Sequence, residues 1–156
     1  MMMLETALTS ITKLGLDTLP IIYFVEAHPK YDERVTEIFR QIASGKLIGV
    51  TSVITLTEVL VHPIRLGEAD LQNDYRDLML NSANFETVFI DTSVAESAAD
   101  LRARYNLRTP DALQIAVAFE KGCEAFLQRW SVEARDRTTC ADIRRTWRFR
   151  AEPIIF

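Results

Sequence analysis

Three acidic residues stand where a carboxylate side chain could take part in chemistry. Asp17 ends the short apolar stretch KLGLD, Glu58 lies inside the apolar segment VITLTEVLV, and Asp111 opens the segment PDALQIA. Taken singly, each has an ordinary explanation. An aspartate after a strand can cap a helix, a glutamate can lie on an exposed helical stripe, and an aspartate suits the positive end of a helix dipole. A site would require the fold to bring the three together.

The segments that carry these residues alternate between extended and helical patterns. We expect strands at residues 13–17, 47–52, 86–91 and 124–127. Amphipathic or capped segments between them predict helices at residues 20–28, 31–45, 53–64, 68–82, 92–106 and 110–121. A strand followed by two helices, repeated three times before a last strand, indicates an α/β domain with a mainly parallel central sheet.

Several helix boundaries can be assigned from capping residues. Ser52 is expected to cap the helix that carries Glu58, and Pro63 should end or bend that helix. Thr109 is expected to cap the last helix, with Pro110 at its first position and Gly122 as its terminator. These assignments place Asp111 in the first turn of a helix.

Together the three carboxylates fit one arrangement. Asp17 at a strand end, Glu58 within a helix and Asp111 at a helix start can all face the same end of a parallel sheet, where open sheets place their ligands. Clustered carboxylates raise one another's pKa unless a cation neutralises them. Oxygen ligands of this kind favour Mg²⁺ or Mn²⁺, and such ions suit phosphodiester hydrolysis because they activate water and stabilise the leaving oxygen.

The same residues carry a resemblance to a known family. The segments LDTLPIIYFVEAHPKY, TSVITLTEVLVHP and LRTPDALQIAVAFEKGCEAFL, in this order and spacing, resemble the PIN-domain nucleases, most closely the VapC-type toxins of bacterial toxin–antitoxin pairs. The resemblance covers about residues 13–127, and TPDALQIA is its most specific part. It implies a three-layer α/β/α domain, a Mg²⁺ or Mn²⁺ site, endonucleolytic cleavage of RNA, a homodimer and a small antitoxin partner.

The resemblance also implies residue roles. Asp17, Glu58 and Asp111 match the family's acidic catalytic and metal-site residues, and Thr18 matches a hydroxyl position often found near that site. Thr109, at the head of TPDALQIA, is a second supporting residue.

The chain departs from the family pattern after Leu127. The family normally continues with a Thr-Asn-Asp-like segment that supplies another acidic residue, whereas this chain continues with QRWSVEARD. Residues 1–127 carry 11 Lys and Arg against 18 Asp and Glu, whereas residues 128–156 carry 7 against 4, with every basic residue an arginine and both tryptophans present. We therefore divide the chain into a PIN-like domain, residues 1–127, and an atypical tail, residues 128–156.

A shift of reading frame at the codons of Leu127 and Gln128 explains the missing motif and the unusual composition together. Read one base later, codons for QRWSVEARD can begin Asn-Asp-Gly, as the family motif requires. The alternative is a divergent tail with its own fold. A tail that binds RNA through arginines and tryptophans is disfavoured because a shifted frame yields the same composition. The codons of the gene distinguish these possibilities.

The overall composition of the chain narrows the range of possible functions. With 48% hydrophobic and 26% charged residues, the chain is expected to form one cytosolic globular domain with reduced thiols at Cys123 and Cys140. Its five glycines form no phosphate-binding loop, which disfavours nucleotide-dependent enzymes. The first hypothesis is thus a metal-dependent endoribonuclease, and the second a catalytically weak PIN fold that binds antitoxin or RNA. A phospho-accepting receiver domain ranks third, since its additional acidic residues and late-strand lysine are missing.

Overall fold

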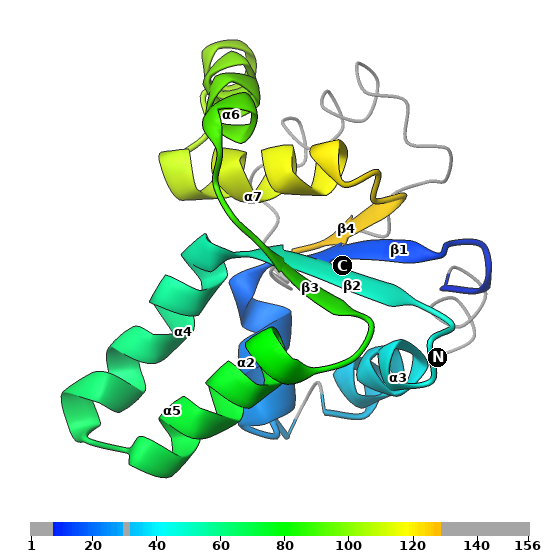
Figure 1. Ribbon diagram of the computed structural model, residues 1–156, viewed down its shortest axis with the longest axis vertical. Coiled ribbons are helices and arrows are strands. Elements are labelled where there is room, and N and C mark those ends of the chain that lie inside the picture. Colours follow the sequence, from blue (N-terminus) through cyan, green and yellow to red (C-terminus); the bar gives the residue numbers. More distant parts are fainter. Residues whose placement is uncertain (1–7, 30–31, 129–156) are drawn as a thin grey trace.

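Four parallel strands form the centre of the protein, with helices on both faces (Figure 1). The structure is a computed structural model that describes residues 8–29 and 32–128. The strands lie in the order β3-β2-β1-β4, and each neighbouring pair is parallel. They are β1 (Lys13–Leu16), β2 (Ile48–Ser52), β3 (Phe85–Val88) and β4 (Ala125–Leu127).

The helices make two outer layers, so the domain has the expected three-layer α/β/α organisation. One face of the sheet is covered by α2 (Thr18–Val25), α3 (Asp32–Ala43), α4 (Val53–Leu66), α5 (Ala69–Arg76) and the π-helical turn η1 (Asp77–Asn81). The other face carries α7 (Thr109–Glu120), on which α6 (Thr92–Tyr105) packs (Figure 1). The predicted fold class and the predicted order of strands and helices are confirmed.

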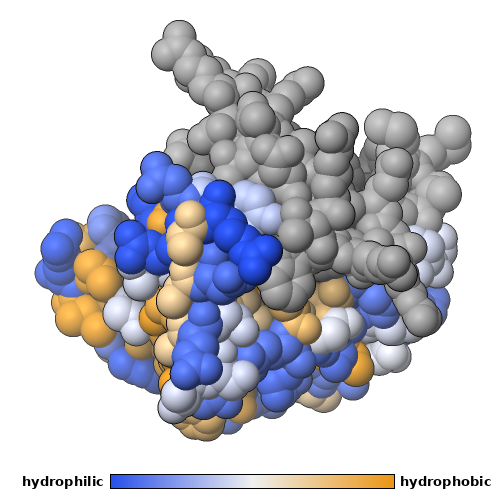
Figure 2. All heavy atoms as spheres, turned by 90° about the horizontal axis from the view of Figure 1, so that it is seen from above, coloured by the Kyte–Doolittle hydropathy of each residue, from blue (hydrophilic) through white to orange (hydrophobic). Residues whose placement is uncertain are grey.

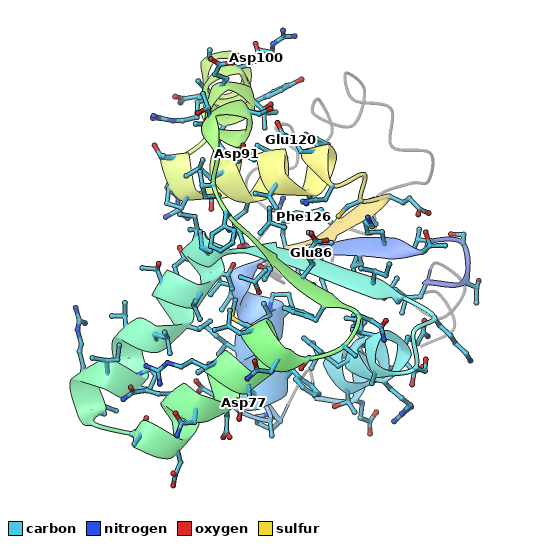
Figure 3. The ribbon with its side chains drawn as sticks, in the orientation of Figure 1. Asp77, Glu86, Asp91, Asp100, Glu120 and Phe126 are labelled. Atoms are coloured by element: carbon cyan, nitrogen blue, oxygen red, sulfur yellow. The ribbon has the colours of Figure 1, made fainter. Side chains whose placement is uncertain are left out.

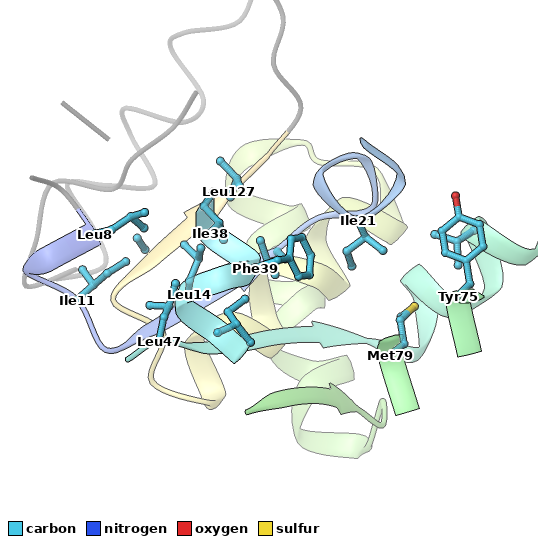
Figure 4. Close-up of a cluster of buried hydrophobic side chains, with 14 residues drawn as sticks. Leu8, Ile11, Leu14, Ile21, Ile38, Phe39, Leu47, Tyr75, Met79 and Leu127 are labelled. Carbon is cyan, nitrogen blue, oxygen red and sulfur yellow. The ribbon is translucent and has the colours of Figure 1, made fainter. Parts of the chain in front are cut away.

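A hydrophobic core lies on each side of the sheet. The larger core, on the side of α2 to α5, includes strand residues Leu14, Leu16 and Leu127 (Figure 4). The amphipathic pattern of α3 buries one face against this core, because Ile38, Phe39 and Ile42 recur at helical spacing and are each at most 5% exposed.

The second core joins α6 and α7 to the sheet. Its members include Val94 and Leu101 of α6, Ala116 of α7 and Phe126 of β4. Most residues of α6 are solvent-exposed, and in Figure 2 hydrophilic residues gather in the part of the view that is not grey, with hydrophobic ones toward its edges. Cys123 is buried beside this core and forms no disulfide, whereas Cys140 lies outside the described residues.

Strands β1 and β2 each lead directly into a capped helix on the face of the sheet that carries the larger core. Asp17 follows β1 and its Oδ1 accepts a hydrogen bond of 2.8 Å from the amide of Thr18, the first residue of α2. Ser52 ends β2 and its Oγ accepts one of 3.2 Å from the amide of Ile54 in α4. Asp and Ser are favoured caps because their side chains satisfy amides that have no partner within the helix. The backbone amide of Asp17 also donates to the carbonyl of Leu127, at 2.9 Å, which aligns the ends of β1 and β4.

One boundary prediction was wrong, and one of the two alternatives for Pro63 was ruled out. Thr109 does not cap α7: the last extended residue is Arg108, which makes no side-chain cap and whose guanidinium pairs with Asp111 instead. Pro63 does not end α4, which continues to Leu66 and stops at Gly67, where φ is +66°. Glycine readily takes the left-handed backbone that closes the helix.

No helix within the described ranges combines the length and the apolar character that a bilayer crossing requires.

Candidate active site

The carboxyl end of the sheet brings together the three elements that carry the predicted acidic residues. Asp17 stands between β1 and α2, Glu58 lies in the second turn of α4, and Asp111 lies in the first turn of α7. Helix α4 packs against both α2 and α7, so the three side chains belong to one region of the surface.

Asp17 has the most perturbed electrostatics of the three. Its pKa is raised to about 6, mainly by burial and to a smaller extent by the negative charges of Asp111 and Glu58, while the hydrogen bond from Thr18 and the charge of Arg108 lower it. Since charge effects of this kind act over short range, the carboxylates of Asp111 and Glu58 are close enough to Asp17 to repel it. The raised pKa of Asp17 thus reports mainly the burial of its carboxylate, with a smaller contribution from the charges of Asp111 and Glu58.

Glu58 is held by a threonine of α2. The Oγ1 of Thr18 donates a hydrogen bond to Oε2 of Glu58, and Thr18 itself is buried. Glu58 lies on an exposed part of α4. The bond from Thr18 holds one of its carboxylate oxygens near the end of β1, where Asp17 lies, rather than in bulk water. The structure therefore places Thr18 in contact with both Asp17 and Glu58.

Asp111 is paired with a cation from its own helix start. The guanidinium of Arg108 donates from Nε to Oδ2 of Asp111 at 2.9 Å and from Nη2 to Oδ1 at 3.3 Å, so both carboxylate oxygens are engaged. Arg108 was not selected from the sequence. Thr109 is exposed at the start of α7, and its supporting role stays a prediction.

Beneath the carboxylates runs a chain of buried polar side chains that sequence reasoning missed. Ser52 Oγ donates to Gln114 Oε1 at 2.6 Å, Gln114 Nε2 donates to Thr55 Oγ1, and Thr51 Oγ1 donates to Thr55 Oγ1 at 2.9 Å. Thr55 Oγ1 lies 3.4 Å from Thr18 Oγ1, so the chain reaches the hydroxyl that holds Glu58.

This polar network connects β2, α4 and α7, and through Thr18 also α2. Each of its members is at most 9% exposed. Buried polar groups must be hydrogen-bonded to be tolerated, so such a network fixes the relative positions of the elements it joins. The available sequence signal was Gln114, a polar residue that stands between apolar neighbours in DALQIAV.

The donor set fits a hard divalent cation by its chemistry, although the carboxylates are not gathered around one point. Within residues 8–29 and 32–128, no three His, Cys, Asp or Glu side chains are disposed to hold a metal ion. Glu58 is engaged by Thr18 and Asp111 by Arg108, while the repulsion felt at Asp17 is what a bound cation would relieve.

No carboxylate from the end of β4 joins the site in the described part of the chain, where Gln128 follows Leu127. Residues 129–156 of the atypical tail lie outside the described residues.

The fold and the site define a class: a parallel three-layer α/β domain with an acidic site at the carboxyl ends of its strands. The sequence model of the PIN domain matches residues 15–129, and the chain belongs to the PIN domain family.

Two solved structures share the fold. A chain of a toxin–antitoxin complex from Klebsiella pneumoniae is 20% identical, with a TM-score of 0.57, over 82% of this chain and 94% of that chain. A chain of VapBC2 from Rickettsia felis, in a crystal structure with a DNA fragment from their promoter, is 14% identical, with a TM-score of 0.62, over 82% of this chain and 95% of that chain. Among curated proteins, none matches the sequence.

Proposed function

We propose that this PIN domain is a divalent-metal-dependent endoribonuclease and the toxin of a toxin–antitoxin pair. The observation that carries the proposal is the convergence of Asp17, Glu58 and Asp111, from three different elements, at the carboxyl end of the sheet. The pKa of Asp17, raised mainly by burial and also by the negative charges of Asp111 and Glu58, supports a cationic ligand at this place.

In this proposal Asp17, Glu58 and Asp111 hold Mg²⁺ or Mn²⁺. When bound, such an ion neutralises charge on a phosphodiester and makes a water molecule more acidic. The chain's own residues provide the framework. The N-terminus of α2 holds Asp17 through the amide of Thr18, and the Thr18 hydroxyl orients Glu58 toward the same place. The role of Thr18 is therefore to support the carboxylates rather than to react, and Thr109, at the start of α7, is the second proposed supporting residue.

Three further parts of the proposal concern partners and place in the cell. A small antitoxin is the proposed regulator, supported by the two similar folds that come from toxin–antitoxin complexes.

A homodimer is supported by exposed aliphatic side chains on α4, namely Val61, Ile64 and Leu66, since exposed hydrophobic patches often mark interfaces. Light scattering of the purified protein tests the dimer. We place the protein in the cytosol, where its proposed substrate, RNA, lies.

The division of the chain also belongs to the proposal. The nuclease domain is residues 1–127, and residues 128–156 are the product of a shifted reading frame. The match to the PIN domain, which ends at residue 129, supports this boundary. Codons that give no Asn-Asp in the shifted frame after Leu127 would rule the frame shift out.

The second candidate function is a catalytically weak PIN fold that acts by binding antitoxin or RNA. The observation in its favour is that β4 of the described chain is followed by Gln128 and by no acidic residue of the expected kind.

Cleavage of a mixed single-stranded RNA by the purified full chain tests both candidates. We expect cutting in Mg²⁺ or Mn²⁺ that disappears with EDTA and falls by about 100-fold or more in Asp17→Asn, because several kcal/mol of metal-dependent stabilisation are lost. Asp100→Asn, a carboxylate on the outer end of α6 in Figure 3, is the matched control and should cut normally.

Absence of cutting by the folded chain, followed by cutting once Asn-Asp is restored after Leu127, would support the second candidate. If the restored protein also failed to cut RNA in either metal, the nuclease proposal would be wrong.

A further inference from the structure

Arg108 is a cation that contacts Asp111 and interacts electrostatically with Glu58 and Asp17. Its guanidinium contacts Asp111 directly, through two hydrogen bonds of 2.9 and 3.3 Å. Its pKa is raised mainly by the hydrogen bond and charge of Asp111, and also by the charges of Glu58 and Asp17. Conversely, the charge of Arg108 lowers the pKa of Asp17. The positive charge of Arg108 thus partly neutralises the cluster from within the chain.

The ion pair contributes little to holding the fold together. The side chain of Arg108 is 82% exposed and that of Asp111 39% exposed, and ion pairs at such exposure are weak because water and salt screen them. Arg108 makes no cap for α7 either. The pair can therefore be exchanged at small cost, which is the property needed if another cation is to reach Asp111.

The geometry of the pair also indicates which group Arg108 can bind once it no longer pairs with Asp111. A guanidinium that engages both oxygens of a carboxylate presents the same planar pair of donors that binds two oxygens of a phosphate. Once free, Arg108 remains at the N-terminal end of α7, directly beside the carboxylate site. A phosphodiester chain that passes over the site would meet this guanidinium.

We propose that Arg108 is a substrate-binding residue that pairs with Asp111 until a divalent cation takes that carboxylate, and then binds a phosphate of the RNA beside the scissile bond. This inference rests on the proposed metal site. It has a distinctive consequence: removing the guanidinium strengthens metal binding but weakens RNA binding. A residue with only a structural role would not change the two affinities in opposite directions.

Calorimetric titration with Mn²⁺ tests the first half. Arg108→Gln should bind Mn²⁺ about 2- to 5-fold more tightly than the wild type, because an exposed competing ion pair is removed. Arg104→Gln is the matched control, since Arg104 forms an exposed ion pair of 2.9 Å with Asp100 on the outer part of α6 and should leave the affinity unchanged. Asp111→Asn should weaken Mn²⁺ binding.

Binding of a fluorescent single-stranded RNA in Ca²⁺ tests the second half, with electrophoresis to confirm that the RNA stays intact. Arg108→Gln should bind more weakly, and the slope of log affinity against log salt should fall by about 0.7, as expected for one lost phosphate contact. Arg108→Lys should keep most of the salt slope but not the full affinity, because lysine supplies charge without the paired donors. Arg104→Gln should match the wild type.

The outcomes separate the inference from the function on which it rests. A wild-type chain that binds no Mn²⁺ contradicts the proposed metal site, and the inference with it. A wild type that binds Mn²⁺, beside an Arg108→Gln variant of equal or lower affinity, contradicts only the exchange at Asp111. Unchanged RNA affinity and salt slope in Arg108→Gln would refute the phosphate contact. Thermal unfolding of each variant verifies that this exposed substitution leaves the fold intact.

Discussion

Asp17 has two roles that oppose each other when no cation is bound. Its Oδ1 caps α2, which stabilises the fold, but its charge is buried and lies close to Asp111 and Glu58, which destabilises it. The raised pKa measures the second effect. Its folded-state pKa of about 6 lies above the ordinary value of 3.8, so the folded state binds a proton more tightly than the unfolded state does. Stability from this group is therefore complete below about pH 3.8 and is lost as pH rises through 6.

Asp17→Asn is accordingly expected to stabilise the metal-free protein. At pH 7.5 in EDTA the gain in free energy of unfolding should be about 1–3 kcal/mol, because each pKa unit corresponds to about 1.4 kcal/mol and asparagine keeps the cap. The gain should shrink as the pH falls from 6 toward 3.8. Urea denaturation at several pH values measures it.

Asp91→Asn is the matched control for this substitution. Asp91 also caps a helix, since its Oδ1 accepts a hydrogen bond of 2.9 Å from the amide of Val94 at the start of α6, but Asp91 is exposed. Its replacement should change stability by less than about 0.5 kcal/mol. Equal effects of the two substitutions, or a loss of stability in Asp17→Asn, would show that burial and repulsion do not govern Asp17.

At the scale of elements, the buried polar network fixes the positions of α4 and α7 relative to β2. Thr55 is its centre, because its hydroxyl lies within hydrogen-bonding distance of Thr51, Gln114 and Thr18. Thr55→Val keeps the shape of the side chain and removes these bonds. The Nε2 group of Gln114 would then lose the acceptor that Thr55 provides, while Gln114 stays 3% exposed. We expect a loss of about 1–3 kcal/mol in free energy of unfolding.

The same change at Thr57 is the control. Thr57 lies on the same helix and is exposed, with its hydroxyl bonded to the carbonyl of Val53. Thr57→Val should be nearly neutral, within about 0.5 kcal/mol, in parallel urea denaturation. If the two substitutions had equal effects, the network would not be the reason for the loss at Thr55.

The elements themselves could be predicted from the sequence because their signals are local. Apolar runs and capping residues such as Ser52 identified the strands and helices, and Asp17, Glu58 and Asp111 could be placed at one end of the sheet from topology alone. The Arg108 pair and the network around Gln114 could not, because they depend on which polar partners meet after long-range packing. The cap at Thr109 failed for a related reason: the sequence does not show that the extended backbone ends one residue earlier, at Arg108.

The contact between β1, β4 and α7 depends on a residue without a side chain. A Cβ added to Gly15 would lie 2.6 Å from Cδ2 of Phe126 and 2.9 Å from Cβ of Ala118. Both neighbours are buried, so Gly15→Ala should destabilise the protein by about 1–3 kcal/mol through overpacking. Adding Phe126→Leu should recover part of the loss, and a double-mutant cycle by thermal unfolding measures this coupling. Strict additivity of the two substitutions would argue against the close contact.

At the scale of the whole molecule, the candidate site joins the two halves of the domain, which are the hydrophobic cores on opposite faces of the sheet. Asp17 and Glu58 belong to elements that pack in the core below the sheet, whereas Asp111 belongs to α7, which packs in the core above it. A cation held by residues from both sides binds only the folded chain, since the unfolded chain does not bring these residues together. Binding therefore stabilises the domain as a unit and not one helix alone.

This coupling predicts that Mn²⁺ raises the midpoint of thermal unfolding. At a concentration about 100-fold above the dissociation constant the stabilisation is about 2.7 kcal/mol, which corresponds to about 5–10 °C for a domain of this size. The shift should disappear in an Asp17→Asn, Asp111→Asn double variant and persist in Asp100→Asn, whose carboxylate lies on the outer end of α6 (Figure 3). Differential scanning fluorimetry over a range of Mn²⁺ concentrations measures it. An equal shift in the double variant would place the stabilising ion elsewhere, because the two carboxylates that join the halves of the domain would then be dispensable.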